Sequence, residues 1–305
     1  MSEALDFLVK LLDIEPIEMN IFRGVSPDEN RQRVFGGQVA AQALMAAGRT
    51  VAQGRVHSLH AYFLRPGDPT VPILYEVDRI RDGRSFCTRR VVAIQHGRAI
   101  FNLATSFHVD EEGPLEHQFP MPDAPDPESL PTMLERLEPL HDRLSEWFAR
   151  PHPIDQRHIG ALPWAGPTGA EPVQRLWIRA DGTLPNDPLL HSCIATYASD
   201  MSLFDTMLAP HEVHWDDADF MGASLDHCMW FHRPFRVDEW LLYDMDSPSA
   251  YGARGIARGF LYTRDGQLAV SMVQEGLMRV VSHAMEKPEH QRSAMAVYER
   301  TSAPQ

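Results

Sequence analysis

The chain carries an internal repeat, and this feature restricts its possible folds more than any other. Three short strings recur in the same order, 166 to 169 residues apart: 58–60 and 224–226, 65–66 and 233–234, 97–101 and 266–270. A similar succession of helix and strand patterns surrounds the strings in both halves. A repeat of both sequence and pattern indicates duplication. We therefore expect two copies of one helix-and-sheet unit.

The first copy begins with helical patterns and continues with strands. Residues 1–15 have the apolar spacing of a short amphipathic helix. Residues 36–48 are almost wholly apolar or small, as in a helix buried on most sides, and Gly36-Gly37-Gln38 forms its N-terminus. Strand-like runs follow at 56–64, 72–79, 85–95 and 99–109, with turn sequences between them. One helix followed by hairpin-linked strands predicts an antiparallel sheet wrapped on that helix.

The second copy follows a proline-rich segment. Residues 114–170, with an amphipathic helix between Pro131 and Pro151, have the composition of a linker. The pattern resumes with a strand at 173–180, a helix from about Asp187 to Leu208, and strands at 223–233, 239–247, 250–263 and 267–280. We expect an α+β protein with an N-terminal unit at 1–115, a linker at 116–170, a C-terminal unit at 171–285 that carries the candidate catalytic residues, and a tail at 286–305.

The charge balance limits the partners. Asp and Glu total 42 against 28 for Lys and Arg, and the formal net charge of -14 repels nucleic acid, which we exclude as a partner. The densest basic cluster consists of arginines at positions 79, 81, 84, 89 and 90. Arginine forks suit a phosphate-bearing ligand, but a solvated strand face with scattered ion pairs has the same composition. Both interpretations stay open.

The cysteines and the termini bear on location. Cys87, Cys193 and Cys228 are an odd, widely spaced trio that forms neither a disulfide framework nor a paired-cysteine zinc motif. The N-terminus lacks the basic start and apolar run of a signal peptide, no apolar stretch is long enough to span a membrane, and residues 301–305 are no peroxisomal address. We therefore expect a cytoplasmic protein without stable membrane insertion, bound metal or cofactor.

Three polar residues of the second copy are candidates for chemistry. Asp200 falls on the shoulder of an apolar helix stripe, so it should be half-buried and need hydrogen-bond partners. Gln274 is the polar exception on the apolar face of its strand. Ser224 opens a strand, but it is outside a Gly-x-Ser-x-Gly elbow, which favours a hydroxyl that orients water over a nucleophile. Purely structural roles stay open, because Thr105 occupies the position of Gln274 in the first copy.

Several strings resemble the acyl-CoA thioesterase II family. The longest is Asp-His-Cys-Met-Trp-Phe-His-Arg-Pro-Phe at 226–235, and the others lie at 34–38, 62–68, 81–83, 197–200 and 273–276. The likeness spans nearly the whole chain and is weakest at about 114–185. It implies a double hotdog fold and hydrolysis of fatty acyl-CoA by a water held among Asp200, Ser224 and Gln274. Bacterial members carry threonine where this chain has Ser224, which supplies the same oxygen without the methyl group.

The implied mechanism is chemically reasonable. A thiol pKa of roughly 8.5 makes the coenzyme A thiolate a good leaving group. We expect Asp200 and Gln274 to orient and polarise the water, Ser224 to complete the hydrogen-bonding set, and backbone N–H groups near the start of the second copy's helix to stabilise the oxyanion. The first copy has the apolar Leu44 near the position where Asp200 would align, so it lacks the acid, which predicts one functional site per chain.

Other functions are compatible with the same residue types. A hydratase or dehydratase could use Asp226 and His227, although neighbouring strand residues point to opposite faces. A metal hydrolase could use residues 211, 212, 214 and 216, but they lack helical spacing. A non-catalytic acyl-CoA sensor is the third alternative. For every alternative that binds acyl-CoA we expect the ligand between the two copies, and exposed sheet edges predict a homo-oligomer, a dimer or a tetramer.

Overall fold

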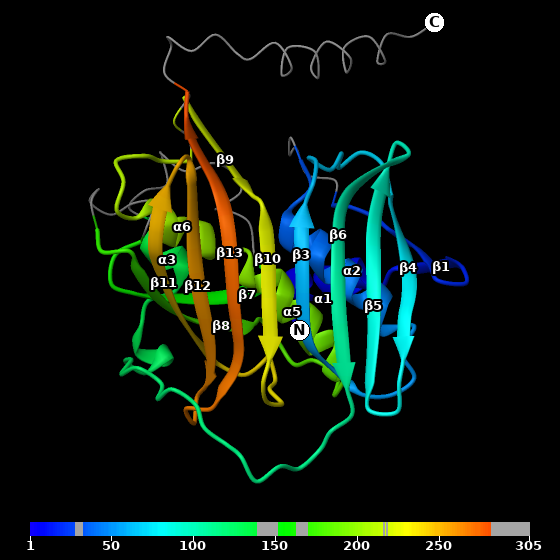
Figure 1. The fold of residues 1–305 in the computed structure, drawn as a ribbon. Helices are drawn as coiled ribbons and strands as arrows, with labels where there is room; N and C mark the ends of the chain where they lie inside the picture. The colour runs from blue at the N-terminus through cyan, green and yellow to red at the C-terminus, as the bar shows by residue number, and fades with distance from the viewer. Residues whose placement is uncertain (28–32, 139–151, 163–169, 216, 218, 282–305) are drawn as a thin grey trace, which may run out of the picture.

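The computed structural model describes residues 1–27, 33–138, 152–162, 170–215, 217 and 219–281. Within these ranges thirteen strands form a single antiparallel sheet in the order β1-β2-β4-β5-β6-β3-β10-β13-β12-β11-β8-β7, with β9 paired to β13 off this path (Figure 1). The elements of the first copy are α1 (Glu3–Leu12), β1 (Glu15–Glu18), β2 (Ile21–Gly24), α2 (Gly36–Gly48), β3 (Arg55–Phe63), β4 (Ile73–Asp82), β5 (Phe86–Gln95) and β6 (Arg98–His108).

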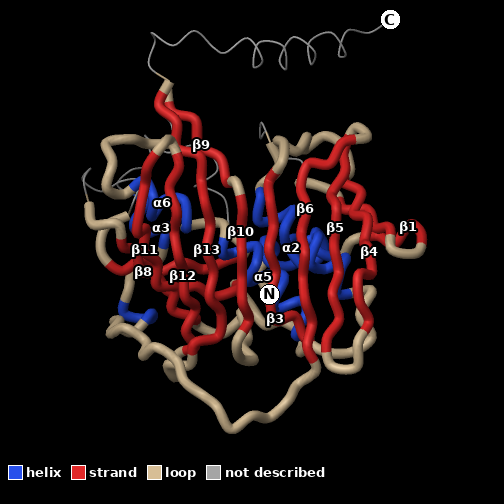
Figure 2. The backbone as a smooth tube through the Cα atoms, in the orientation of Figure 1, coloured by secondary structure: helices blue, strands red, loops and turns tan. Residues whose placement is uncertain are grey.

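The second copy repeats this arrangement. Its elements are β8 (Val173–Ala180), α5 (Pro188–Ser199), α6 (Leu203–Leu208), β9 (Phe220–Ser224), β10 (Asp226–Phe231), β11 (Leu241–Tyr251), β12 (Arg254–Thr263) and β13 (Leu268–Val280). Strands β3 and β10 pair in the centre, with His60 opposite Cys228, so the sheet is continuous across the two copies. Figure 2 shows α2 and α5 together behind this central region. The predicted antiparallel, helix-wrapped architecture is confirmed.

The two central helices form for local reasons and are then enclosed by the sheet. Asp187 caps α5 by accepting hydrogen bonds from the backbone N–H groups of Leu189 and Leu190, and Pro188 occupies the first turn, where its missing N–H costs nothing. Helix α2 is buried along nearly its whole length, as its small and apolar residues predict. Because α2 and α5 are neighbours, residues at their ends are brought together from opposite halves of the chain.

The segment between the copies is more structured than a linker. It contains the short helices η1 (Pro127–Ser129) and α3 (Met133–Leu137) and the strand β7 (Ile154–Ile159), which pairs with β8 and extends the sheet. Strand β7 was not predicted from the sequence, since a six-residue strand among prolines has no clear periodicity. Its partner across the sheet is what stabilises it. The proposed domain boundaries stay a prediction.

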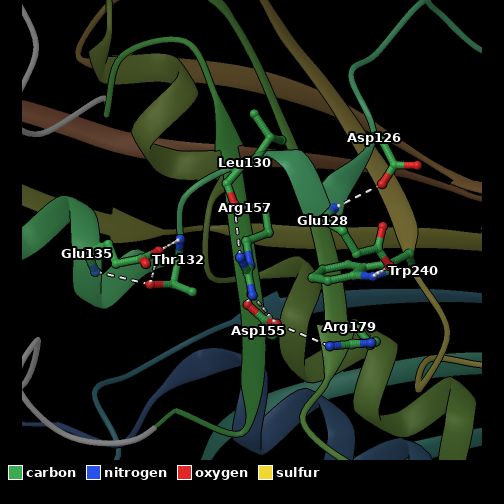
Figure 3. A network of polar contacts seen from close by, with 9 residues as sticks. All are labelled: Asp126, Glu128, Leu130, Thr132, Glu135, Asp155, Arg157, Arg179 and Trp240. Atoms are coloured by element: carbon green, nitrogen blue, oxygen red, sulfur yellow. Dashed lines mark hydrogen bonds and ion pairs between the residues drawn. The ribbon is translucent and has the colours of Figure 1, made fainter.

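Polar contacts hold this segment against the second copy (Figure 3). Arg157 on β7 donates from Nη1 to the carbonyl oxygen of Leu130 at 2.9 Å. Trp240 donates from Nε1 to Oε1 of Glu128 at 3.0 Å, and the guanidinium of Arg179 lies 4.3 Å from the centre of the Trp240 ring. The segment therefore packs on a defined surface of the second copy.

Two predicted elements are interrupted in the structure. The helix predicted from Asp187 to Leu208 is two helices, because α5 ends at Ser199 and α6 begins at Leu203. The strand predicted at 223–233 is divided between β9 and β10 at Leu225. Both interruptions fall beside candidate site residues. In the part of the chain that the structure describes, no helix has the length and apolar character needed to cross a membrane.

Candidate active site

Asp200 lies at the C-terminal end of α5, where the helix stops. Its backbone has φ −80° and ψ −3°, and its N–H donates to the carbonyl of Ala198. The preceding carbonyl, on Ser199, accepts a 2.8 Å hydrogen bond from the Tyr243 hydroxyl. Since the helix does not continue past this point, the Asp200 side chain projects from a helix end. It is half-buried, as the sequence predicts.

Ser224 lies at the end of β9, next to a shift in strand register. Ser224 is opposite Gly276 of β13, whereas Cys228 of β10 is opposite Val273, so the register changes by one residue between the two strands. At this break Asp226 accepts a hydrogen bond through Oδ1 from the backbone N–H of Glu275 at 2.7 Å. The shift in register directs the Ser224 side chain toward Gln274 of β13. A period-two sequence pattern cannot predict such a shift.

Gln274 connects the other two candidates, Asp200 and Ser224, through hydrogen bonds. Its side chain is fully buried on β13, and Nε2 donates to Oδ1 of Asp200 at 2.7 Å and to Oγ of Ser224 at 2.6 Å. The structure therefore places Asp200, Ser224 and Gln274 within hydrogen-bonding distance, although 74 residues separate the first from the last. All three residues were candidates from the sequence.

The surroundings make the Asp200 carboxyl a stronger base than an ordinary aspartate. Burial raises the pKa of Asp200 from 3.8 to about 6, because it penalises the charged form. Hydrogen bonds from Gln274, the Gly37 backbone and Ser224, together with the charge of Arg33, oppose this rise in pKa. The group is therefore mostly ionised at pH 7, with a pKa close enough to neutrality for proton transfer.

The first copy supplies one side of the site. The backbone N–H of Gly37, in the first turn of α2, lies close enough to the Asp200 carboxyl to lower its pKa. A Cβ atom on Gly36 would lie 2.8 Å from Oδ2 of Asp200, so only glycine permits this approach. The Phe35 ring packs edge-on against Tyr197 at 5.1 Å between centroids. Arg33 donates from Nη2 to the carbonyl of Gly222 at 3.0 Å. The site lies where the two copies meet.

This geometry corrects the predicted position of the oxyanion donors. The sequence placed them near the start of the second copy's helix, which was predicted to begin at about Asp187. That end of α5 is a full helix away from Asp200, about 18 Å for twelve residues at 1.5 Å each. The helix N-terminus beside Asp200 belongs instead to α2 of the first copy. The glycine pair that opens α2 was the available signal, but sequence alone does not show which helix end faces which.

The predicted arginine cluster is largely occupied by structural contacts. Arg89 is only 1% exposed, and its guanidinium donates to Oγ1 and O of Thr50 and to Asp82. Arg79 donates to Asn20 and Arg90 to Asp78. These contacts favour the ion-paired strand surface over a phosphate site for three of the five arginines.

The alternative sites gain no support from the geometry. His227 is buried, with Nε2 2.8 Å from Oγ of Ser199, whereas the Asp226 carboxylate binds the backbone of Glu275. The two residues therefore have separate partners. Among the described residues no cluster of His, Cys, Asp or Glu could hold a metal ion, and residue 216 of the proposed set lies outside them.

The corresponding positions of the first copy have structural roles. Thr105, which aligns with Gln274, donates its hydroxyl to the carbonyl of Ser58 at 2.9 Å, and Ser58 aligns with Ser224. Leu44, which the sequence placed near the counterpart of Asp200, lies within α2 and is fully buried in the core, whereas Asp200 follows the last residue of α5. The carboxylate, hydroxyl and amide set therefore occurs at the second-copy positions but not at the aligned ones.

Solved structures define the class of protein. Acyl-CoA thioesterase II TesB2 from Mycobacterium marinum is similar with a TM-score of 0.75 and 40% sequence identity, covering 92% of this chain and 100% of that one. A conserved protein with a hot dog fold from Alicyclobacillus acidocaldarius has a TM-score of 0.71 at 18% identity, which supports the fold alone. The expected double hotdog fold is thereby confirmed, and the protein is a double hotdog thioester hydrolase.

Sequence comparison identifies the family. A model described as acyl-CoA thioesterase matches residues 146–277, and one described as acyl-CoA thioesterase N-terminal domain matches residues 26–108. Acyl-coenzyme A thioesterase 8 of Homo sapiens is 40% identical over 291 residues, 90% of each chain. Acyl-CoA thioesterase 2 of Haemophilus influenzae is 41% identical, over 92% of this chain and 99% of that protein. The chain belongs to the acyl-CoA thioesterase II family.

Proposed function

We propose that this enzyme hydrolyses fatty acyl-CoA to free fatty acid and coenzyme A by direct attack of water on the thioester. The observation that supports this most strongly is the double hydrogen bond from the buried Gln274 amide to Asp200 and Ser224. A buried amide needs partners, and here both partners are groups that can hold a water molecule. No covalent intermediate is required.

Asp200 acts as the general base. Its carboxylate takes a proton from water while the water oxygen bonds to the thioester carbon, forming a tetrahedral oxyanion. The carbon–sulfur bond then breaks, the coenzyme A thiolate leaves, and the proton held by Asp200 neutralises it. The raised pKa of about 6 suits both the acceptance and the return of this proton. Gln274 and Ser224 fix the carboxylate and the water.

Backbone N–H groups at the start of α2 stabilise the oxyanion. Phe35 at the N-cap supplies no side-chain hydrogen bond to this turn, so the helix end is not closed by a capping side chain. The Gly37 N–H lowers the pKa of Asp200, and the other N–H groups of the turn, with the helix dipole, favour negative charge in front of the helix. The substrate thioester therefore binds between the two copies.

Isotope labelling in a single turnover tests the reaction. With enzyme in excess over acyl-CoA in ¹⁸O-water, direct attack places one ¹⁸O in the released fatty acid, and coenzyme A appears as free thiol. Label in the Asp200 peptide, with unlabelled acid, would show an anhydride intermediate and contradict the proposal. A changed double bond would indicate a hydratase, and saturable binding without turnover would indicate a sensor. Cytoplasmic location and a dimer or tetramer stay predictions.

A further inference from the structure

The proposed mechanism requires one orientation of the Gln274 amide. Nε2 must face Asp200 and Ser224, since a flipped amide would place Oε1 against the carboxylate. The two ends of an amide have nearly the same shape, so packing alone does not distinguish them. A donor on the Oε1 side is needed to hold the productive orientation.

His227 is in the position to supply this donor. In the pairing of β10 with β13, Cys228 lies opposite Val273. His227 and Gln274 are the next residues of the two strands, at the shift in register, and the Gln274 side chain acts on the pKa of His227. Both side chains are buried, with His227 1% exposed and Gln274 fully enclosed.

Two buried atoms without hydrogen-bond partners also indicate a contact between His227 and Gln274. Among the described residues, Oε1 of Gln274 and Nδ1 of His227 are buried atoms without a hydrogen bond of normal geometry. The other ring nitrogen, Nε2, lies 2.8 Å from Oγ of Ser199. Burial lowers the pKa of His227 to about 4, while interaction with the Gln274 side chain raises it. The ring is therefore neutral at pH 7 and carries a single N–H.

We propose that His227 is a positioning residue whose Nδ1–H donates to Oε1 of Gln274 and thereby holds Nε2 of the amide toward Asp200 and Ser224. The Ser199 hydroxyl has one proton and two acceptors within reach, the Thr196 carbonyl at 2.9 Å and Nε2 of His227 at 2.8 Å. The proposed tautomer requires that this proton be donated to Nε2. The resulting relay runs from Ser199 through His227 and Gln274 to Asp200, each donor facing an acceptor. This inference rests on the proposed function, because it assigns Gln274 a role in holding the carboxylate and the water.

Two substitutions separate this role from simple packing. In asparagine the amide nitrogen can take the position of histidine Nδ1. In glutamine the amide nitrogen can take the position of histidine Nε2. H227N therefore keeps a donor toward Gln274, whereas H227Q loses it. We expect kcat of H227N to exceed that of H227Q by tenfold or more, with KM changed less than threefold in both. Equal kcat values in two folded variants would overturn the proposal.

The pH dependence of kcat/KM in the same variants should not change if His227 acts only by packing. In H227Q the amide is free to turn Oε1 toward Asp200, and loss of the Gln274 donor raises the pKa of that carboxyl. The acid limb of kcat/KM should therefore shift upward by about one pH unit in H227Q. The other groups that act on this carboxyl and its surroundings, Arg33 and Tyr243, are unchanged. An unshifted limb would contradict the proposal.

The Q274L variant distinguishes failure of this inference from failure of the proposed function. If Q274L keeps wild-type kcat, the assigned site itself is wrong. If Q274L loses activity while H227Q keeps wild-type kcat and pH profile, only the role of His227 is wrong. The double variant should be no less active than Q274L, since His227 acts through Gln274.

The tautomer can also be observed without any substitution. The ¹⁵N chemical shifts of a neutral imidazole show which ring nitrogen bears the proton, and the His227 signals are those missing from H227N. Protonation on Nδ1 in the wild-type enzyme is the expected result. Protonation on Nε2 would overturn the proposal even if every variant at this position fails to fold.

Discussion

Replacing Asp200 with asparagine should lower kcat at least 100-fold and remove a loss of stability that the wild-type protein undergoes as the pH rises to neutrality. The pKa of Asp200 in the folded protein is about 6, against 3.8 for an ordinary aspartate, chiefly because of burial. At about 1.4 kcal/mol for each pKa unit, ionising this group above pH 6 costs the folded state about 3 kcal/mol. The side chain is half-buried, so solvent screening reduces the expected cost to about 2 kcal/mol.

The sign of the effect follows from proton linkage. The folded pKa lies above the unfolded value, so the folded state binds more protons between pH 4 and pH 6, and its stability falls as the pH rises through this window. Asparagine does not titrate, so the stability of the variant does not fall through this contribution as the pH rises. The free energy of unfolding of D200N relative to wild type should therefore rise by about 2 kcal/mol between pH 4 and pH 7.5.

Asp205 provides a matched control. Burial raises its pKa to about 6 as well, against a hydrogen bond from Trp215, yet we assign it no part in the reaction. Urea denaturation at pH 4 and pH 7.5, with thiol release from acyl-CoA at pH 7.5, should give D205N a similar gain in relative stability with normal turnover. Under the same conditions D200N should lose at least 100-fold in kcat. Wild-type turnover in D200N, or a relative stability independent of pH, would refute the reasoning.

The remaining predictions concern the same site and one distant contact. In wild type, kcat/KM should rise as the pH increases through about 6, because Asp200 must be ionised, and a flat profile from pH 5 to 8 would be inconsistent with this. G36A should lose tenfold or more in kcat, since its Cβ would lie 2.8 Å from the Asp200 carboxylate; steady-state kinetics at saturating acyl-CoA would show this. S224T should keep kcat within about threefold, whereas S224A should lose about tenfold, so equal rates would argue against a role for the hydroxyl. R89M should lower the free energy of unfolding by about 2–4 kcal/mol in urea titrations, because it leaves the Thr50 carbonyl unpaired in the core, and an unchanged urea midpoint would contradict this.

Periodicity predicted the regular elements and failed where they are interrupted. The buried helix at 36–48 and the strands that follow it were predictable because their apolar spacing repeats over many residues. The break of the helix at Asp200 was not, because the apolar stripe continues into α6 while the backbone stops being helical at Ser199. The hydroxyl of Tyr243, which is distant in sequence, donates a hydrogen bond to the carbonyl of Ser199, the last residue of α5. The short strand β7 likewise depends on its pairing with β8.

The sequence by itself determined the duplication, the helix-and-sheet pattern and the residue types of the site, because these depend on local composition and spacing. It also predicted the half-buried position of Asp200. Only the tertiary structure decided that the N-terminus of α2, and not that of α5, faces Asp200. It also decided that the buried His227 and Gln274 side chains interact. Both follow from the pairing of strands far apart in the chain, which no local pattern encodes.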